Sequence, residues 1–231
     1  MRFVSRARNV LLAGQVAAIV ALAAAPAVAA PGVSTPAVAG PRAMQGATAS
    51  LRDGQLLEPV VSLAAARALM ADKVAAAKYG TGTPIDDPVR EQQVLDSMAG
   101  RGQAMGLDPA DVRRVFRDQI EANKLVQRQL FRLWDTGVLP PPTDRPSLAE
   151  IRPVIDRLNG DLLAALADAG SVRTTPGCWA NLAWSWQAVV REQHLNALHT
   201  VALARAVPSL CMPGRAPGQA AGRSPQALGQ Q

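Results

Sequence analysis

The sequence predicts an all-α protein, a bundle of about five to six helices closed by one disulfide. Good helix formers, alanine above all, dominate the composition, and aromatic residues make up only 3% of the chain. Apolar residues recur at helical spacing, whereas runs of Val, Ile, Tyr and Phe of strand length are missing. Acidic and capping residues followed by proline or leucine mark the starts of several helices. A β-sandwich or barrel is therefore not expected.

The first 29 residues have the three parts of a secretory signal. Residues 1–8 carry three arginines and no acidic residue, residues 10–25 are apolar, and Ala27-Val28-Ala29 is a small-x-small cleavage site. Cleavage after Ala29 is favoured, because cleavage after Ala30 would leave proline at the new N-terminus. The alternative is a retained membrane anchor, but a membrane span needs about 20 apolar residues. We expect an exported protein, periplasmic or extracellular, with no membrane association after cleavage.

The net charge does not indicate a nucleic-acid partner. Arg2, Arg6 and Arg8 lie in the expected leader and account for half of the formal net charge of +6. The other basic residues form no cluster with interleaved aromatic residues, which is the pattern typical of nucleic-acid binding. No nucleic-acid partner is therefore expected.

The exported chain divides into three parts. Residues 30–54 are rich in Pro, Ala, Gly and Ser/Thr without a period and predict a flexible lead-in, and residues 213–231 predict a disordered tail. Residues 55–212 lie between them and are long enough for one helical domain. Asp-Pro pairs and a Ser-x-x-Glu capping box within this domain predict helices over about 56–79, 88–105, 109–134, 148–170 and 179–207.

Cys178 and Cys211 are the two cysteines of the chain. Export places them in an oxidising compartment, where two cysteines usually form one disulfide. Closing the intervening loop would stabilise the fold by about 3.8 kcal/mol on chain-entropy arithmetic. The alternative is half of a zinc site with His194 and His199, but no Cys-x-x-Cys or His-x-x-x-His pair is present. We expect a disulfide and no metal.

Four polar residues stand where their helices are otherwise apolar. Arg67 and Lys78 are eleven residues apart, about three helical turns, so both project from one line of the first helix among alanine and valine. Asn123 and Gln127 form an i, i+4 pair amid apolar residues of the third helix. Two cations on such a line predict something anionic between the helices. Solvated helix faces are the alternative for both pairs.

Asp87 and Arg90 stand at the start of the second helix, with Glu91 beside them. Asp87 can cap this helix and also hold the Arg90 guanidinium in place for a ligand. Such pairs are also common on helix surfaces. On its own, this motif therefore does not establish a site.

The motifs of several common enzyme classes are missing. The chain has no Gly-x-Ser-x-Gly elbow, no His-Glu-x-x-His pair and no Gly-rich phosphate loop. Hydrolysis by a nucleophile–base pair or by a metal ion is therefore disfavoured. An enzyme with this sequence would work through arginines, a lysine and an amide.

Three segments carry a family resemblance. They are Arg67 and Lys78 with the segment 84–91, then the segment 108–120 with Asn123 and Gln127, and finally Arg152 with the segment 155–159. In this order and spacing they resemble the all-α (AroQ-class) chorismate mutases. The last segment and the two cysteines resemble the exported subclass in particular. The resemblance covers about residues 55–212 and implies the type II-like chorismate mutase fold.

The resemblance also implies a reaction and the residues that hold its substrate. The reaction is the pericyclic rearrangement of chorismate to prephenate, a step of aromatic amino acid biosynthesis that requires no cofactor and no metal. Arg67, Arg90 and Arg152 would hold the two carboxylates of chorismate. Lys78 and Gln127 would donate hydrogen bonds to its ether oxygen.

Three further roles follow from the resemblance. Asn123 would help to seat a carboxylate, and Asp87 would support Arg90 and the ring side of the substrate. Glu91 would accept a hydrogen bond from the ring hydroxyl, because exported relatives often use a residue at the position of Val94, which cannot accept one here.

The chain departs from the family pattern at two positions. Many exported members have glutamate where this chain has Gln127, and a glutamate can donate only when it is protonated. Pro153 directly follows Arg152, removes a backbone donor and favours a kink in the helix that carries Arg152.

Other functions remain open at this point. A non-catalytic exported helical module could bind a partner through Trp179, Trp184 and Trp186, although we expect these residues to be core of the last helix. An isochorismate pyruvate-lyase would have the same fold and a different reaction. Relatives are commonly dimers, so the resemblance leaves a homodimer open.

Overall fold

The structure is a computed structural model that describes residues 41–212. Within this range it contains six α-helices, two short 3₁₀ helices and no strand, which confirms the all-α prediction. The elements in chain order are α1 (Pro41–Lys78), α2 (Pro88–Ala104), α3 (Pro109–Asp135), α4 (Leu148–Asp168), η1 (Val172–Thr174), α5 (Cys178–Glu192), α6 (Ala197–Ala206) and η2 (Pro208–Leu210).

Parts of the predicted organisation lie outside the described residues. These parts are the signal peptide, the lead-in up to residue 40 and the tail from residue 213. Helix α1 begins at Pro41, earlier than the predicted start near Leu56, and continues through Pro59. Among the described residues, no helix is both long enough and apolar enough to cross a membrane.

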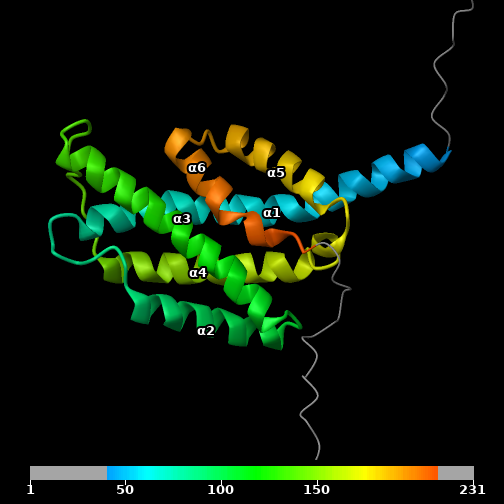
Figure 1. Ribbon diagram of the computed structural model, residues 1–231, viewed down its shortest axis with the longest axis horizontal. Coiled ribbons are helices and arrows are strands. Elements are labelled where there is room, and N and C mark those ends of the chain that lie inside the picture. Colours follow the sequence, from blue (N-terminus) through cyan, green and yellow to red (C-terminus); the bar gives the residue numbers. More distant parts are fainter. Residues whose placement is uncertain (1–40, 213–231) are drawn as a thin grey trace, which may run out of the picture. The chain divides into compact units, whose positions relative to one another are not determined.

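Helix α1 packs against most of the other helices. It contacts α3, α4, α5 and α6, while α2 packs on α3 and α4 (Figure 1). Its buried face is rich in alanine, and small side chains allow neighbouring helices to approach closely. The buried alanines of α1 are Ala64, Ala65, Ala68, Ala71, Ala75 and Ala76.

The predicted starts of three helices are confirmed. Asp87 and Asp108 each accept a backbone N–H of the first turn of α2 and α3, which explains why these helices begin there. Ser147 and Glu150 form the capping box of α4. Helix α4 continues through Pro153, so this proline does not end the helix that carries Arg152.

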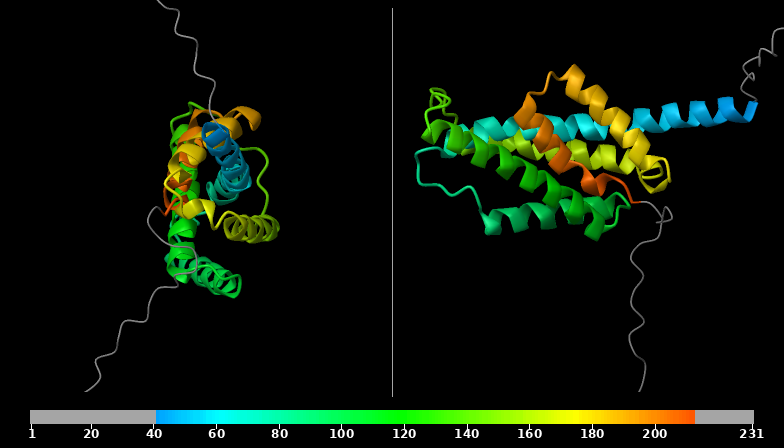
Figure 2. Two further views of the ribbon diagram at one scale, coloured as in Figure 1. Left: turned by 90° about the vertical axis from the view of Figure 1, so that its right-hand side faces the viewer. Right: turned by 45° about the horizontal axis from the view of Figure 1, so that its top comes forward.

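The single helix predicted over 179–207 is wrong, because two helices occupy this range. Helix α5 ends at Glu192, and His194 has a φ of 49°, which a continuous helix does not allow. Asn196 then caps α6 by accepting a hydrogen bond from the backbone N–H of His199 at 3.0 Å. Figure 2 shows the resulting bend between α5 and α6.

The predicted disulfide between Cys178 and Cys211 is present. It joins the first residue of α5 to the residue after η2. Because both sulfurs are in this bond, they cannot bind zinc together with His194 and His199.

The tryptophans of α5 are not all core residues, contrary to the prediction. Trp179 is 48% exposed and Trp184 is 69% exposed, whereas Trp186 is partly buried against the core. The buried face of α5 is formed by residues at helical spacing, namely Cys178, Asn181, Leu182, Ser185 and Val189. Trp184 lies off this face, because it directly precedes Ser185 and a single step rotates the helix by about 100°.

Candidate active site

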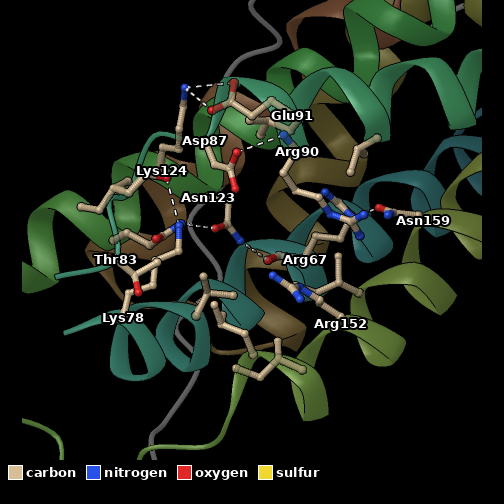
Figure 3. A pocket seen from close by; sticks show the side chains of 18 residues that line it. Arg67, Lys78, Thr83, Asp87, Arg90, Glu91, Asn123, Lys124, Arg152 and Asn159 are labelled. Carbon is tan, nitrogen blue, oxygen red and sulfur yellow. Dashed lines mark hydrogen bonds and ion pairs between the residues drawn. The ribbon is translucent and has the colours of Figure 1, made fainter. Parts of the chain in front are cut away.

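A cavity of about 200 Å³ lies between the C-terminal half of α1, the start of α2, the middle of α3 and the first half of α4. Figure 3 shows the side chains that line it, which come from these four helices and from the loop before α2. The structure brings together at this cavity all eight residues that the sequence predicted for the site: Arg67, Lys78, Asp87, Arg90, Glu91, Asn123, Gln127 and Arg152.

Arg67 is buried at the inner end of the cavity. Its side chain donates a hydrogen bond to the amide oxygen of Asn159, and its Nε has no hydrogen-bond partner among the described residues. Burial lowers the pKa of Arg67 to about 10, and the charge of Asp156 opposes this shift. A buried guanidinium with an unused donor is suited to binding an anion.

Lys78 lies on the same line of α1, as the spacing of eleven residues predicted. Its ammonium donates to the carbonyl oxygens of Pro84 at 2.9 Å and Ile85 at 3.0 Å. Burial lowers the pKa of Lys78, although the nearby carboxylates, Asp87 first among them, oppose the shift. Because an ammonium has three protons, one donor remains for a ligand.

The predicted pairing of Asp87 with the Arg90 guanidinium is wrong. The Asp87 carboxylate accepts from the backbone N–H of Arg90 at 3.0 Å, so the capping role is confirmed. The guanidinium instead lies 3.8 Å from a carboxylate oxygen of Asp156 on α4. The Asp87 carboxylate is used to cap α2. Arg90 pairs with Asp156 because α2 packs on α4.

Asn123 and Gln127 line the cavity and belong to one chain of hydrogen bonds. The Gln127 side chain donates to the Asn123 amide oxygen at 2.6 Å, and Asn123 donates to the Arg67 carbonyl at 3.4 Å. The amide group of Gln127 has two N–H donors, so this arrangement uses one and leaves one. The chain therefore fixes the orientation of Gln127 relative to α1.

Arg152 enters the cavity from α4 and makes no ion pair with any described residue. Asn159 lies two turns further along the same face and holds Arg67. No role was predicted for Asn159. It stands seven residues after Arg152, and this spacing indicates that both residues lie on one face of the helix.

Lys124 is a charged cavity residue that was not predicted from the sequence. It follows Asn123 directly and stands four residues after Ile120, which also lines the cavity, so the helical period could have placed it on this face. Its ammonium lies 3.2 Å from a carboxylate oxygen of Glu91 (Figure 3). Glu91 also accepts from Arg117 at 2.9 Å.

The charges of the cavity favour an anionic ligand. Five cationic side chains line it, against the two carboxylates of Asp87 and Glu91. Among the lining residues that the structure describes there is no cysteine, histidine or serine, so the cavity offers no nucleophile–base pair of the usual kind. The arrangement can hold a dianion in one conformation and donate hydrogen bonds to it.

Comparisons with known proteins agree with this chemistry. The family model of chorismate mutase type II matches residues 58–128. A secreted chorismate mutase of Mycolicibacterium smegmatis is 36% identical over 163 residues, which are 71% of this chain and 90% of the relative. A secreted chorismate mutase of Mycobacterium tuberculosis is 34% identical over 67% of this chain and 78% of the relative. The crystal structure of a chorismate mutase from Burkholderia phymatum superimposes with a TM-score of 0.66 at 36% identity, over 69% of this chain and 98% of the other.

Proposed function

The chain belongs to the family of secreted chorismate mutases, and we propose that it rearranges chorismate to prephenate as an exported enzyme. One observation carries the proposal. Arg67, Lys78, Arg90 and Arg152 converge on one cavity from three helices, and the described residues offer Arg67 and Arg152 no ion-pair partner there. Chorismate is a dianion of matching charge.

The reaction explains the residue types. The rearrangement is a concerted shift of electrons, so it requires no nucleophile, general base or metal ion. The enzyme lowers the barrier by holding the flexible dianion in its compact reactive conformer. It also stabilises the negative charge that develops on the ether oxygen as the C–O bond breaks, which affects the transition state more than the ground state.

The arginines would hold the carboxylates. Arg67 has an unused buried Nε, and Arg152 makes no ion pair among the described residues, so both have donors for a ligand. Arg90 has only a long contact to Asp156, at 3.8 Å, and this contact is half exposed. Exchanging it for a substrate carboxylate therefore costs little free energy. Asn123 would contribute an amide beside Arg67.

Lys78 and Gln127 would donate to the ether oxygen. Each is fixed by hydrogen bonds within the protein, Lys78 by two carbonyls and Gln127 by Asn123, and each keeps one free donor. Donors that are already oriented need no reorganisation during the reaction. Asp87 would act by fixing the start of α2 and hence Arg90. Glu91 would accept from the ring hydroxyl.

The decisive experiment uses the full chain, expressed with its leader and recovered after export. The recovered protein should convert chorismate to prephenate, identified by product chromatography, and its N-terminal sequence should begin at Ala30. Isochorismate should not release pyruvate in a parallel reaction. A recovered, folded protein that leaves chorismate unchanged would refute the proposed function.

A further inference from the structure

Lys124 binds acidic residues from three segments of the chain. Its ammonium contacts Glu121 on α3 at 2.7 Å, Asp86 in the loop before α2 at 3.1 Å and Glu91 on α2 at 3.2 Å. The side chain is only 11% exposed, and it lines the cavity. Although burial opposes the charge, hydrogen bonds to these three carboxylates raise the pKa of Lys124. It therefore remains a cation inside the site.

The geometry leaves Lys124 no proton for the substrate. An ammonium has three protons, and three carboxylates surround this one. Lys78 differs in this respect, because its two carbonyl partners leave one donor unused. Lys124 must therefore act on the reaction through the acidic residues that it holds.

Glu91 is held on both carboxylate oxygens. Lys124 lies 3.2 Å from Oε1 and 3.4 Å from Oε2, and Arg117 donates to Oε2 at 2.9 Å. A carboxylate has about four acceptor positions, so these contacts occupy three of them and leave one on Oε1. A carboxylate held in this way offers one fixed acceptor to a ligand hydroxyl.

Asp86 connects the same lysine to the loop between α1 and α2. This loop supplies the carbonyls of Pro84 and Ile85 that hold Lys78. Asp86 is also bound by Arg128 at 2.6 Å, outside the cavity lining. The loop thus has two attachments to α3, of which only Lys124 also reaches Glu91.

We propose that Lys124 is a positioning residue that fixes Glu91 as the acceptor for the ring hydroxyl of the substrate, and so makes the enzyme select substrates that carry this hydroxyl. The inference rests on the proposed function. Lys124 does not touch the reacting atoms.

The test compares two ligands in the Lys124→Met variant. One ligand is chorismate, and the other is the analogue in which hydrogen replaces the ring hydroxyl, used as a competitive inhibitor. The KM for chorismate should rise about tenfold, the effect of losing one hydrogen bond to a charged group. The inhibition constant of the analogue should change less than about twofold, because the analogue has no hydroxyl for Glu91 to bind.

Arg128→Met is the matched control. It removes the other cation that binds Asp86 but leaves Glu91 and its contacts intact. Its KM for chorismate should stay within about twofold of that of the unmodified enzyme. Should Lys124→Met fail to fold, Lys124→Gln keeps a polar side chain without the positive charge that holds Glu91 and should show the same selective rise in KM.

Two outcomes would overturn the inference. If the Lys124→Met variant lost the same affinity for chorismate and for the analogue, Lys124 would act through its charge or through folding and not through Glu91. If the KM for chorismate did not change, Lys124 would have no role in substrate binding. In both cases the unmodified enzyme still forms prephenate. Failure of the proposed function is distinguishable, because the unmodified enzyme would then form none.

Discussion

Arg67 and Arg173 are both buried arginines, at 6% and 1% exposure, but their surroundings differ. Arg173 lies in η1 near the disulfide and forms an ion pair of 2.8 Å with the buried carboxylate of Asp111. It also donates to the carbonyls of Leu210 at 2.8 Å and Ser209 at 3.2 Å. Arg67 lies at the cavity, has no carboxylate within ion-pair distance among the described residues, and keeps an unpartnered Nε.

The difference separates a cation with a structural partner from one that is available to a ligand. Burial lowers the pKa of both arginines, and at Arg173 the charge of Asp111 and a hydrogen bond to it oppose that shift. Arg173 has its counter-charge, Asp111 on α3, inside the fold. Because Arg173 also donates to the Leu210 carbonyl, it links the segment at Leu210 to α3. Arg67 has no carboxylate within ion-pair distance in the described part of the chain and is influenced only by the more distant charge of Asp156, so an anion that enters the cavity would further offset its desolvation.

The largest effect on stability should come from Arg173→Met. The substitution leaves the buried carboxylate of Asp111 with only Arg114, a half-exposed partner at 3.2 Å. The free energy of unfolding should fall by about 3–5 kcal/mol, as when one member of a buried ion pair is removed. Urea denaturation with the disulfide intact measures it, and Arg114→Met, expected to cost less than about 1 kcal/mol, is the control. A loss below about 1 kcal/mol for Arg173→Met would erase the distinction between the two arginines.

Lys78→Ala should cause the largest loss of activity. Removing a preorganised donor to the ether oxygen should lower kcat/KM by about a hundredfold to a thousandfold, or about 2.7–4 kcal/mol. Far-UV circular dichroism should show unchanged helical content, because the lost partners are loop carbonyls. Turnover equal to that of the unmodified enzyme would show that the cavity is not the site of the reaction.

Arg67→Met is the same substitution as Arg173→Met, made at the arginine that lines the cavity. Its kcat/KM should fall about tenfold to a hundredfold, since a charged hydrogen bond to a carboxylate is lost. Its free energy of unfolding should fall by only about 1–2 kcal/mol, because the buried Asn159 loses a hydrogen-bond donor but no buried acid is left without a partner. Arg67→Lys should also be harmful, because an ammonium cannot replace a bidentate guanidinium. A destabilisation as large as that of Arg173→Met would contradict the comparison.

The smallest effect concerns pH. Because Gln127 is a neutral donor, kcat/KM should be flat from pH 5 to 8. It should fall at alkaline pH, where Arg67 and Lys78, whose pKa values burial lowers, lose their charges earlier than ordinary side chains would. Gln127→Glu should introduce a decline of about tenfold per pH unit, since a carboxylate donates only when protonated. Such a decline in the unmodified enzyme would refute the role of Gln127.

The local features of the fold could be predicted from the sequence. Helix starts at Asp87, Asp108 and Ser147 depend on a capping side chain and its near neighbours, and these lie within a few residues. Helical spacing likewise placed Arg67 with Lys78, and the family resemblance added the residues on the other helices. The break between α5 and α6 was missed, because no proline or glycine marks it and the polar residues around His194 are also common on exposed helix faces.

The sequence alone thus determined the helical class, the cysteine pair and the shared helix face of Arg67 and Lys78, because each depends on residue type and on spacing along one chain segment, while Arg90 and Arg152 came from the family resemblance. Only the tertiary structure decided which residues from different helices meet. Asp156 lies beside Arg90, Asn159 holds Arg67, and Lys124 binds Glu91. Helical periodicity fixes the face on which a side chain lies, whereas its partner depends on how the helices pack, and a single sequence does not encode that packing in any local pattern.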